Sequence, residues 1–396
     1  MKTIIPIILL LLSVLSYGQW TPLNVNMNSN FVDVQFLNDS VGFVTGSNGA
    51  ILKTTDHGLS WINTNNTGNT SAFRIHFPGD SVGYGLALNN LFKTVDQGVT
   101  WFALPAFNTF DKKNLFFLND STGFFISGYG GVDKTTDGGM NWNPLNTNCT
   151  GTLAEEDIFF ADPNTGYFGG WYSTCASRTT DGGNTWLVLP NNLLYVIKSI
   201  YFTSVSTGYM TGWNSSQTEG IEKTSDSGNT WVMLNTPSWS YTSIYCTDSN
   251  TCYAVGPYGV ISKTTDGGIN WQQQSSGTIQ ALTKIYCTDA NTCYAVGDSG
   301  VVLKTVNGGV TGLTDYAQDL SDINLFPNPV SDKLTINLSS DKWKEIFISD
   351  VMDKLIIHQD ADSSVIKIDV SELEQGVYFL QMKGKSGMEV RRFIKL

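Results

Sequence analysis

Residues 135–142 read TTDGGMNW, and close copies of this stretch recur through most of the chain. An aspartate marks six copies, and a seventh copy carries asparagine in its place. In chain order the markers are Asp56, Asp96, Asp137, Asp181, Asp226, Asp266 and Asn307. Successive markers are separated by 40, 41, 44, 45, 40 and 41 residues. This period matches one four-stranded blade of a β-propeller.

Each position of the repeat has a physical role in a tight turn. The carboxylate of Asp137 can accept hydrogen bonds from the backbone amides of its own turn. Gly139 supplies a positive φ without steric strain. Trp142 offers about 150–250 Å² of surface to bury between neighbouring sheets. Near-identical turns spread around a ring cannot all form one active site, so we interpret the six aspartates as structural.

The segments around each motif predict four strands per unit. Apolar or alternating runs such as 31–37 (FVDVQFL) indicate a first strand, and a turn leads from it into a second. The third strand runs into the motif, as in 50–56 (AILKTTD), and the fourth follows the tryptophan, as in 186–190 (WLVLP). No part of residues 19–312 keeps a helical period, so we predict an all-β domain.

The last copy of the motif, 305–313 (TVNGGVTGL), has Gly312 where the tryptophan should stand. The segment 19–23 (QWTPL) resembles the start of the fourth strand in other units, as in 142–145 (WNPL). We therefore predict that this segment pairs with the last third strand and that Trp20 supplies the missing indole. The result is a seven-bladed β-propeller over residues 19–312, whose closure removes two exposed sheet edges.

The pattern Ser/Thr-x-Asp-x-Gly-x-x-Trp resembles the Asp-box of sialidases and related BNR-like propellers. Dense Asp-boxes, the CYAVG strands at 252–256 and 293–297, and the pattern at 256–271 resemble the propeller family of photosystem II assembly and stability factors. These resemblances imply a non-catalytic scaffold whose Asp-box turns lie on the face away from the ligand.

The photosynthetic role does not carry over. That family binds protein partners through basic surfaces, whereas most cations here immediately precede the repeat motif. These cations are Lys53, Lys93, Lys134, Arg178, Lys223, Lys263 and Lys304. Sialidase activity is also disfavoured, because gripping a carboxylate in that way needs three clustered arginines and residues 19–312 hold only Arg74 and Arg178. The stretch 73–78 (FRIHFP) resembles a sialidase FRIP motif, but it falls in a first strand, so we interpret the match as coincidental.

Composition and targeting signals restrict the function further. The chain has a formal net charge of −12, so we expect no nucleic-acid partner. Residues 1–18 resemble a secretory signal peptide, and no later segment is apolar enough to be an integral membrane span. The only histidines are His57, His76 and His358, scattered along the chain, so we expect no metal site and no cofactor.

Six cysteines in an exported chain indicate disulfides. Two pairs share one spacing, Cys246 with Cys252 and Cys287 with Cys293, and we expect each to bridge a hairpin between first and second strands. Cys149 and Cys175 remain, and we predict that they join two adjacent loops.

The irregular, unrepeated loops are the candidate ligand-binding face. Aromatic residues beside a carboxylate can stack on sugar rings or anchor a protein partner. The alternative is that these aromatic residues only pack their own long loops. The candidates are Tyr129, Trp171, Tyr172, Trp213, Glu219, Trp239 and Tyr258. We predict a non-catalytic recognition or adhesion module with an unknown protein or glycan ligand. The alternative function is a secreted polysaccharide-active enzyme of the glycoside hydrolase type, since that chemistry needs only two suitably spaced acids.

The C-terminal part of the chain has a different pattern. Residues 313–322 are polar and indicate a linker, and residues 323–396 contain alternating strands that predict a small β-sandwich. The stretches FPNPVSDKLTI, LEQGVYFLQM and the terminal FIKL resemble the C-terminal sorting domain of type IX secretion in Bacteroidota. This resemblance implies Sec export followed by type IX passage, with type IX machinery as partner. The protein would then be secreted or attached to the outer-membrane surface.

Overall fold

The computed structural model describes residues 19–396 apart from short gaps. The gaps are 89, 106–111, 128–130, 148–155, 171–175, 190–195, 214–218, 239, 310–322, 328–329, 339–342, 351–353 and 385–386. The chain divides into two compact units, residues 1–311 and 312–396. The signal peptide, the linker and the Cys149–Cys175 bridge expected from the sequence lie outside the described residues.

The described part of the first unit forms seven antiparallel four-stranded sheets. The first strands are β2 (Phe31–Phe36), β6 (Phe73–His76), β10 (Lys112–Phe117), β14 (Glu156–Phe160), β18 (Val196–Phe202), β22 (Ser243–Cys246) and β26 (Leu282–Cys287). The second strands are β3 (Gly42–Gly46), β7 (Gly83–Ala87), β11 (Gly123–Ser127), β15 (Gly166–Gly170), β19 (Gly208–Trp213), β23 (Cys252–Val255) and β27 (Cys293–Gly297).

The outer half of each sheet begins with the strand that precedes the repeat motif. These third strands are β4 (Ala50–Thr54), β8 (Asn90–Thr94), β12 (Gly131–Thr135), β16 (Ser177–Thr179), β20 (Glu219–Thr224), β24 (Ile261–Thr264) and β28 (Val302–Thr305). The fourth strands are β5 (Ile62–Asn63), β9 (Phe102–Ala103), β13 (Asn143–Leu145), β17 (Leu187–Val188), β21 (Val232–Met233), β25 (Gln272–Gln274) and β1 (Thr21–Pro22). Two short 3₁₀ turns, η1 (Pro257–Gly259) and η2 (Asp298–Gly300), join second to third strands.

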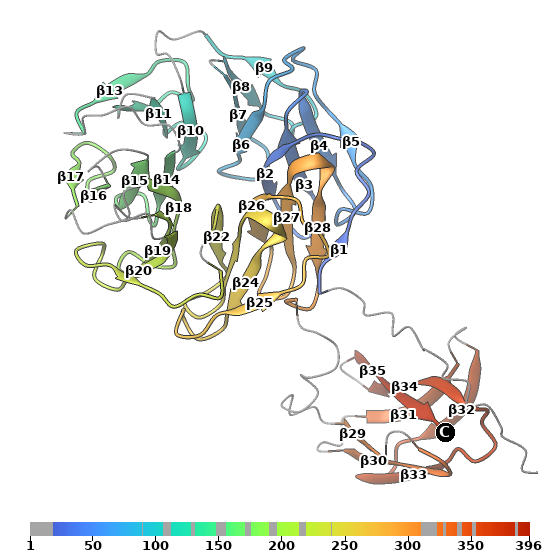
Figure 1. Ribbon diagram of the computed structural model, residues 1–396. Helices are drawn as coiled ribbons and strands as arrows, with labels where there is room; N and C mark the ends of the chain where they lie inside the picture. The colour runs from blue at the N-terminus through green and yellow to red at the C-terminus, as the bar shows by residue number, and fades with distance from the viewer. Residues whose placement is uncertain are drawn as a thin grey trace, which may run out of the picture. The chain divides into compact units, whose positions relative to one another are not determined.

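The sheets are arranged as a ring with the first strands nearest its centre (Figure 1). Within the described residues every element is a strand or a short 3₁₀ turn. This arrangement is the all-β propeller that the repeat predicts.

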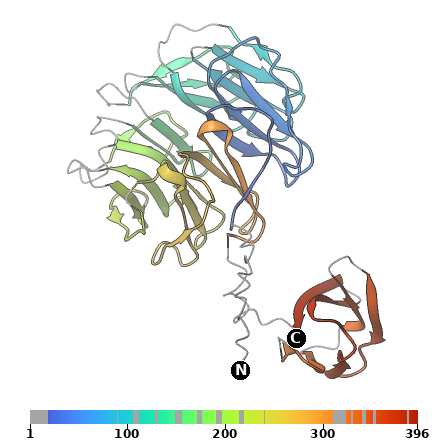
Figure 2. The same cartoon turned by 45° about the vertical axis from the view of Figure 1, so that its right-hand side comes forward.

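One sheet is built from both ends of the first unit. Strand β1 pairs with β28, with Thr21 opposite Lys304 and Pro22 opposite Leu303. The two strands lie side by side in both views (Figures 1 and 2). Trp20 is only 1% exposed, and its Nε1 donates a 2.8 Å hydrogen bond to Oε1 of Gln274. Trp20 therefore occupies the position that the last motif leaves without a tryptophan.

The repeat motifs form one kind of turn throughout. In the third sheet Asp137 Oδ1 accepts hydrogen bonds from Thr135 Oγ1 and from the amides of Met140 and Asn141, at 2.9–3.0 Å. The Thr135 hydroxyl in turn accepts the amide of Gly139 at 2.9 Å. Hydrogen bonds from the amide and side chain of Asn141 lower the pKa of Asp137 to about 2. The carboxylate is therefore ionised at neutral pH and holds its own turn closed.

Among the described residues, six of the seven cations that precede the motifs join neighbouring sheets. Lys134 Nζ donates to the carbonyl of Gly182 at 2.7 Å, and Arg178 Nη1 donates to the carbonyl of Ser227 at 2.6 Å, each in the motif of the next sheet. Lys304 donates to the carbonyl of His57 at 2.8 Å, which completes the ring. These cations hold the scaffold together, as their place in the repeat suggests.

The hairpin between first and second strands has two versions. In five sheets a phenylalanine ring lies across a glycine, as Phe36 lies across Gly42, where an added Cβ would collide with the ring. The other two sheets have disulfides at the equivalent pair, Cys246–Cys252 and Cys287–Cys293, each with a Cα–Cα distance of 4.0 Å. These are the two hairpin bridges expected from the shared cysteine spacing.

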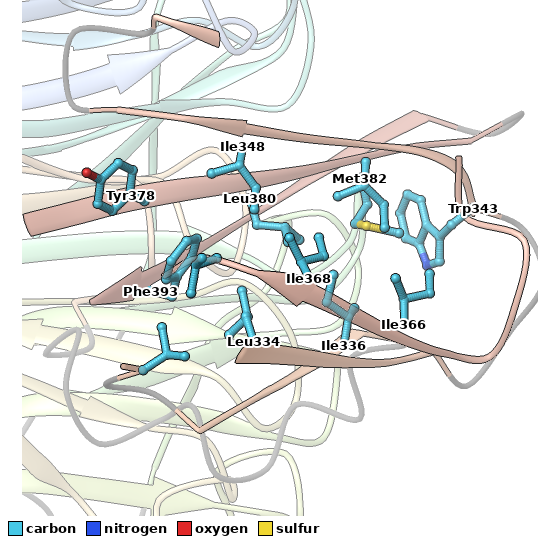
Figure 3. Packing of buried hydrophobic residues seen from close by; sticks show 13 residues of the cluster. Leu334, Ile336, Trp343, Ile348, Ile366, Ile368, Tyr378, Leu380, Met382 and Phe393 are labelled. Atoms are coloured by element: carbon cyan, nitrogen blue, oxygen red, sulfur yellow. The ribbon is translucent and has the colours of Figure 1, made fainter. Parts of the chain in front are cut away.

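The second unit contains two sheets. One has the order β29-β30-β33, with β29 (Ile323–Phe326), β30 (Lys333–Leu338) and β33 (Val365–Asp369). The other has the order β32-β31-β34-β35, with β31 (Trp343–Ser349), β32 (Leu355–Asp360), β34 (Gly376–Gly384) and β35 (Gly387–Lys395). Leu334 and Ile368 of the first sheet face Leu380 and Phe393 of the second across a buried apolar core (Figure 3). This packing is the small sandwich that the alternating strands predict.

Candidate functional site

The seven first strands line a channel through the centre of the ring. At one level they contribute an aromatic collar: Gln35, His76, Phe116, Phe159, Tyr201, Tyr245 and Tyr286. Neighbouring rings from His76 round to Tyr286 have centroids 4.5–6.0 Å apart. Burial lowers the pKa of His76 to about 4 and raises the pKa of Tyr201 to about 12, so both are uncharged at neutral pH. The collar is therefore a neutral, mostly apolar lining.

The next level of the channel is polar, and we call it the polar belt. Its members hold equivalent register positions opposite the second strands: Asp33, Arg74, Asn114, Asp157, Ser199, Ser243 and Lys284. Unlike the Asp-box turns, these equivalent positions carry acids, bases, an amide and hydroxyls. The chemistry of the belt thus differs from sheet to sheet.

Several belt and collar side chains link one first strand to the next. Asp33 accepts the amide of Ile75 at 3.0 Å, and Asp157 accepts the amide of Ile200 at 2.9 Å. Ser199 and Ser243 accept the equivalent amides of the following strands at 3.5 and 3.4 Å. Gln35 and His76 accept the amides of Phe77 and Phe117 from the collar level. These inter-strand bonds satisfy edge amides that would otherwise face the channel.

Above the belt the channel opens into a cavity of about 240 Å³, which we call the channel mouth. A second cavity of about 150 Å³, between belt and collar, shares three of its lining residues. The mouth is lined by Val32, Arg74, Asn114, Asp157, Lys198, Thr242, Thr283 and Lys284. Three cations and one carboxylate therefore line this cavity, in a chain with 23 basic and 35 acidic residues.

Two of the mouth cations have N–H donors that no described residue accepts. Among the described residues, neither Arg74 nor Lys284 forms a hydrogen bond or an ion pair within 4.0 Å. Both act electrostatically on Asp33, where burial raises the carboxyl pKa and the two cations, Lys284 first, oppose that rise. Asp33 uses its oxygens on the amides of Val34 and Ile75 instead.

The third cation, Lys198, connects the mouth to the candidate loop face. Its Nζ lies 3.6 Å from Oε2 of Glu219 and 5.4 Å from the ring centroid of Trp213. Trp213 and Glu219 are directly opposite each other at the ends of β19 and β20. An ion pair and a cation–π contact thus fix Lys198 at the rim.

The sequence-based candidates are distributed as follows. The structure brings Trp213 and Glu219 together beside Lys198, although both belong to strands and not to the loop expected there. Tyr258 lies in η1, is 74% exposed and has a φ of 58°. Tyr129, Trp171, Tyr172 and Trp239 lie outside the described residues, as do Cys149 and Cys175.

The belt cations were missed from the sequence. We assigned the cations mostly to the repeat and treated 73–78 as a coincidental match, yet its Arg74 lines the mouth together with Lys198 and Lys284. An alignment of the first strands places Arg74 and Lys284 at equivalent positions, whereas Lys198 lies in an irregularity one residue before the equivalent Ser199.

The described residues show neither a metal site nor a membrane-spanning helix. They contain no cluster of three or more His, Cys, Asp or Glu side chains able to hold a metal ion. No helix in this part of the chain is long and apolar enough to span a membrane.

Fold and site together define a class, an Asp-box β-propeller joined to a secretion tail. Residues 324–396 match the family model described as "Secretion system C-terminal sorting domain", which indicates type IX export to the cell surface or outer membrane. Residues 12–156 match the model described as "Photosynthesis system II assembly factor YCF48". Both resemblances drawn from the sequence are therefore confirmed.

Individual proteins agree with these family matches. The photosystem II assembly lipoprotein Ycf48 of Synechococcus sp. (strain CC9902) is 26% identical over 146 residues, which cover 35% of this chain and 44% of that relative. The chain thus matches less than half the length of this relative.

Solved structures share the fold. A structure of YCF48 bound to D1 peptide has a TM-score of 0.62 at 20% identity and covers 74% of this chain and 98% of its own. The GH74 enzyme of Niastella koreensis has a TM-score of 0.58 at 14% identity and covers 94% of this chain and 74% of its own. At such identities the likeness concerns the fold alone, and it includes both a peptide-bound propeller and an enzyme.

Proposed function

We propose that this exported propeller is a non-catalytic recognition or adhesion module that binds a protein or glycan ligand at the channel mouth. The observation that carries the proposal is the grouping of Arg74, Lys198 and Lys284 around one cavity. The cations that precede the Asp-boxes bridge sheets, but these three do not belong to the repeat. Arg74 and Lys284 act on the pKa of Asp33 only through space, and their N–H donors form no hydrogen bond among the described residues, so we assign these donors to a ligand.

In this proposal the sorting tail directs the export of the protein. Residues 323–396 engage the type IX machinery, and the propeller carries the ligand-binding activity. The peptide-bound YCF48 structure is a precedent for ligand binding by a propeller of this fold.

An exported enzyme of the glycoside hydrolase type is the second candidate, favoured by the fold likeness to GH74 enzymes. Asp33 and Asp157 are the carboxylates that line the cavity between belt and collar. Both carboxylates accept hydrogen bonds from backbone amides, and Asp157 also accepts one from Asn114 Nδ2 at 2.8 Å. A general acid or base needs an oxygen within reach of its substrate, which argues against catalysis by this pair.

The test is a ligand screen with the full mature chain. Glycan and peptide arrays would be probed with the wild type, with an Arg74→Gln/Lys284→Gln double variant, and with Lys333→Gln as a charge control on the tail. We expect at least one ligand to be retained by the control and lost by the double variant, with no change in the ligand's mass. Cleaved product would favour the enzyme, and a screen in which nothing binds, or in which the double variant binds equally, would refute the channel-mouth proposal.

A further inference from the structure

The donors at the channel mouth suit a ligand that carries hydrogen-bond acceptors. Arg74 offers five N–H donors and Lys284 three, and neither is engaged within the described residues. The one carboxylate that lines the mouth already accepts hydrogen bonds within the protein. Asp157 accepts Asn114 Nδ2 and two backbone amides, and the hydroxyls of Thr242 and Thr283 donate to backbone carbonyls. An oxygen-rich anionic group would complete this surface.

The charge around the mouth favours a singly charged group. Two carboxylates stand just behind its lining, Asp33 beside Arg74 and Lys284, and Glu219 beside Lys198. Together with Asp157 they offset much of the positive charge of the three cations. A phosphate or polyphosphate carrying two or more charges would meet these acids, whereas one carboxylate fits the planar fork of an arginine.

An extended peptide has no strand edge to pair with in the channel. The first strands are the inner edges of their sheets, yet their amides are bonded to side chains of the neighbouring sheet at Ile75, Phe77, Phe117, Ile200, Ile244 and Ile285. Main-chain pairing, which supplies much of the affinity in strand addition, is therefore blocked. The donors left over are side-chain cations at the mouth, which suit a ligand recognised through its substituents.

The floor and rim of the mouth fit the end of a sugar chain. Below the belt the centroids of neighbouring collar rings lie 4.5–6.0 Å apart around the channel, and this ring of side chains forms the floor on which the end of a sugar chain would rest. At the rim the indole of Trp213 is held by the Lys198–Glu219 pair. An apolar indole face suits the C–H face of a pyranose, and the sugar's hydroxyls can both donate and accept.

We infer that the channel mouth binds the carboxylate of an acidic sugar at the end of a glycan, with Arg74 and Lys284 gripping the carboxylate. Lys198 and Trp213 then contact the sugar ring from the rim. The inference rests on the proposed function and names the ligand class for the same site.

The experiment compares matched probes by titration calorimetry on the full mature chain. Trigalacturonate is paired with its methyl ester, which keeps the rings and removes the charge. Glycyl-glycyl-glycine with a free carboxylate is paired with its amide, and inorganic sulfate serves as a simple anion. We expect binding of trigalacturonate and at least tenfold weaker binding of its ester, as for loss of a charged hydrogen bond worth about 1.5–3 kcal/mol.

Variants locate the site. Arg74→Gln and Lys284→Gln should each weaken trigalacturonate binding about tenfold or more, Arg74→Lys should recover part of the loss, and Lys333→Gln should have no effect. Thermal unfolding of each variant checks the fold, and Lys284→Gln still decides the matter if Arg74→Gln does not fold.

The outcomes separate the two claims. Equal binding of acid and ester, or binding of the free-carboxylate peptide or of sulfate without trigalacturonate, would overturn the acidic-sugar inference. In those cases the recognition function would stand if the array ligand still depended on Arg74 and Lys284. If no probe and no array member bound the wild type, both would fall.

Discussion

The Asp-box turns and the polar belt are two levels of one ring. The turns are nearly the same from sheet to sheet, whereas the belt residues differ. At the Asp-box end the described sheets repeat one kind of turn: six copies have an aspartate that accepts hydrogen bonds within the turn, and in six sheets the preceding cation donates to the motif of the next sheet. At the belt, equivalent register positions hold Asp33, Arg74, Asn114, Asp157 and Lys284. Identical residues meet a structural requirement that every sheet shares. Residues that differ around the ring meet no requirement common to every sheet, which is why the proposed ligand site lies at their level.

The belt nevertheless contains residues of two kinds, acids that link neighbouring strands and cations that do not. Asp33 and Asp157 line the cavity between belt and collar, and they also link successive first strands. Arg74, Lys198 and Lys284 have no such linking role among the described residues. The comparison therefore predicts that acids of the belt affect stability, whereas its cations affect binding.

The largest expected effect comes from the ring's closure. Trp20→Ala should lower the free energy of unfolding by about 3–5 kcal/mol, the range for deleting a buried aromatic ring. Trp20 is 1% exposed, contacts Tyr253 edge-on and bonds to Gln274, so little can compensate for its loss. Phe102→Ala, at a fourth-strand position that is 46% exposed, is the control and should change stability little. Unfolding in guanidinium measures both, and equal midpoints for Trp20→Ala and wild type would contradict closure by the N-terminal strand.

Next in size is the exchange of one hairpin version for the other. Removing the Cys246–Cys252 bridge by Cys246→Ala/Cys252→Ala should destabilise by about 2–3 kcal/mol in the loop-entropy model. Cys246→Phe/Cys252→Gly installs the pair found in five other sheets, as at Phe36 and Gly42, and should recover part of that loss. If it is less stable than the double alanine variant, then the sheets are not interchangeable at this position.

The repeated layer and the closure could be predicted from the sequence because each rests on local spacing. The motif fixes its own turn, the missing tryptophan at Gly312 points to Trp20, and a six-residue spacing places Cys246 and Cys252 across one hairpin. The channel mouth could not be read this way, since Arg74, Lys198 and Lys284 are far apart in the chain and belong to no motif. They meet only because the ring closes, and their level depends on a register that bulges shift in some first strands, such as β2 and β26.

Replacing a belt acid should have a smaller effect, and it tests whether the belt acids stabilise the fold more than the belt cations do. Asp157→Ala removes the acceptor for the amides of Ile158 and Ile200 and should destabilise by about 1–3 kcal/mol, as for buried groups left unpaired. Asp157→Ser should be milder, because Ser199 and Ser243 accept the equivalent amides in the following sheets. Lys284→Gln is the matched belt variant and should destabilise less, because Lys284 acts on Asp33 only through space and its loss leaves no amide unpaired. If Lys284→Gln destabilised as much as Asp157→Ala, the division between linking acids and binding cations would be wrong.

The smallest effect expected is the pH dependence of a single Asp-box. Hydrogen bonds from Asn141 hold the pKa of Asp137 at about 2, below the ordinary value of about 3.9. A carboxyl whose pKa is lowered by folding adds stability above its unfolded pKa, and this contribution is lost as the pH falls through about 2. Asp137→Asn copies the residue found at Asn307, where the amide oxygen still accepts Thr305 Oγ1 at 2.9 Å and the amide of Gly309 at 3.0 Å. It should therefore fold at neutral pH with a slightly lower melting temperature, since Asp137 is exposed and solvent screens its charge. Melting curves between pH 7 and pH 2 should show the wild type's small advantage shrinking toward zero below pH 4. An advantage that stays constant with pH would mean that the ionised carboxylate contributes nothing beyond the hydrogen bonds that asparagine also makes.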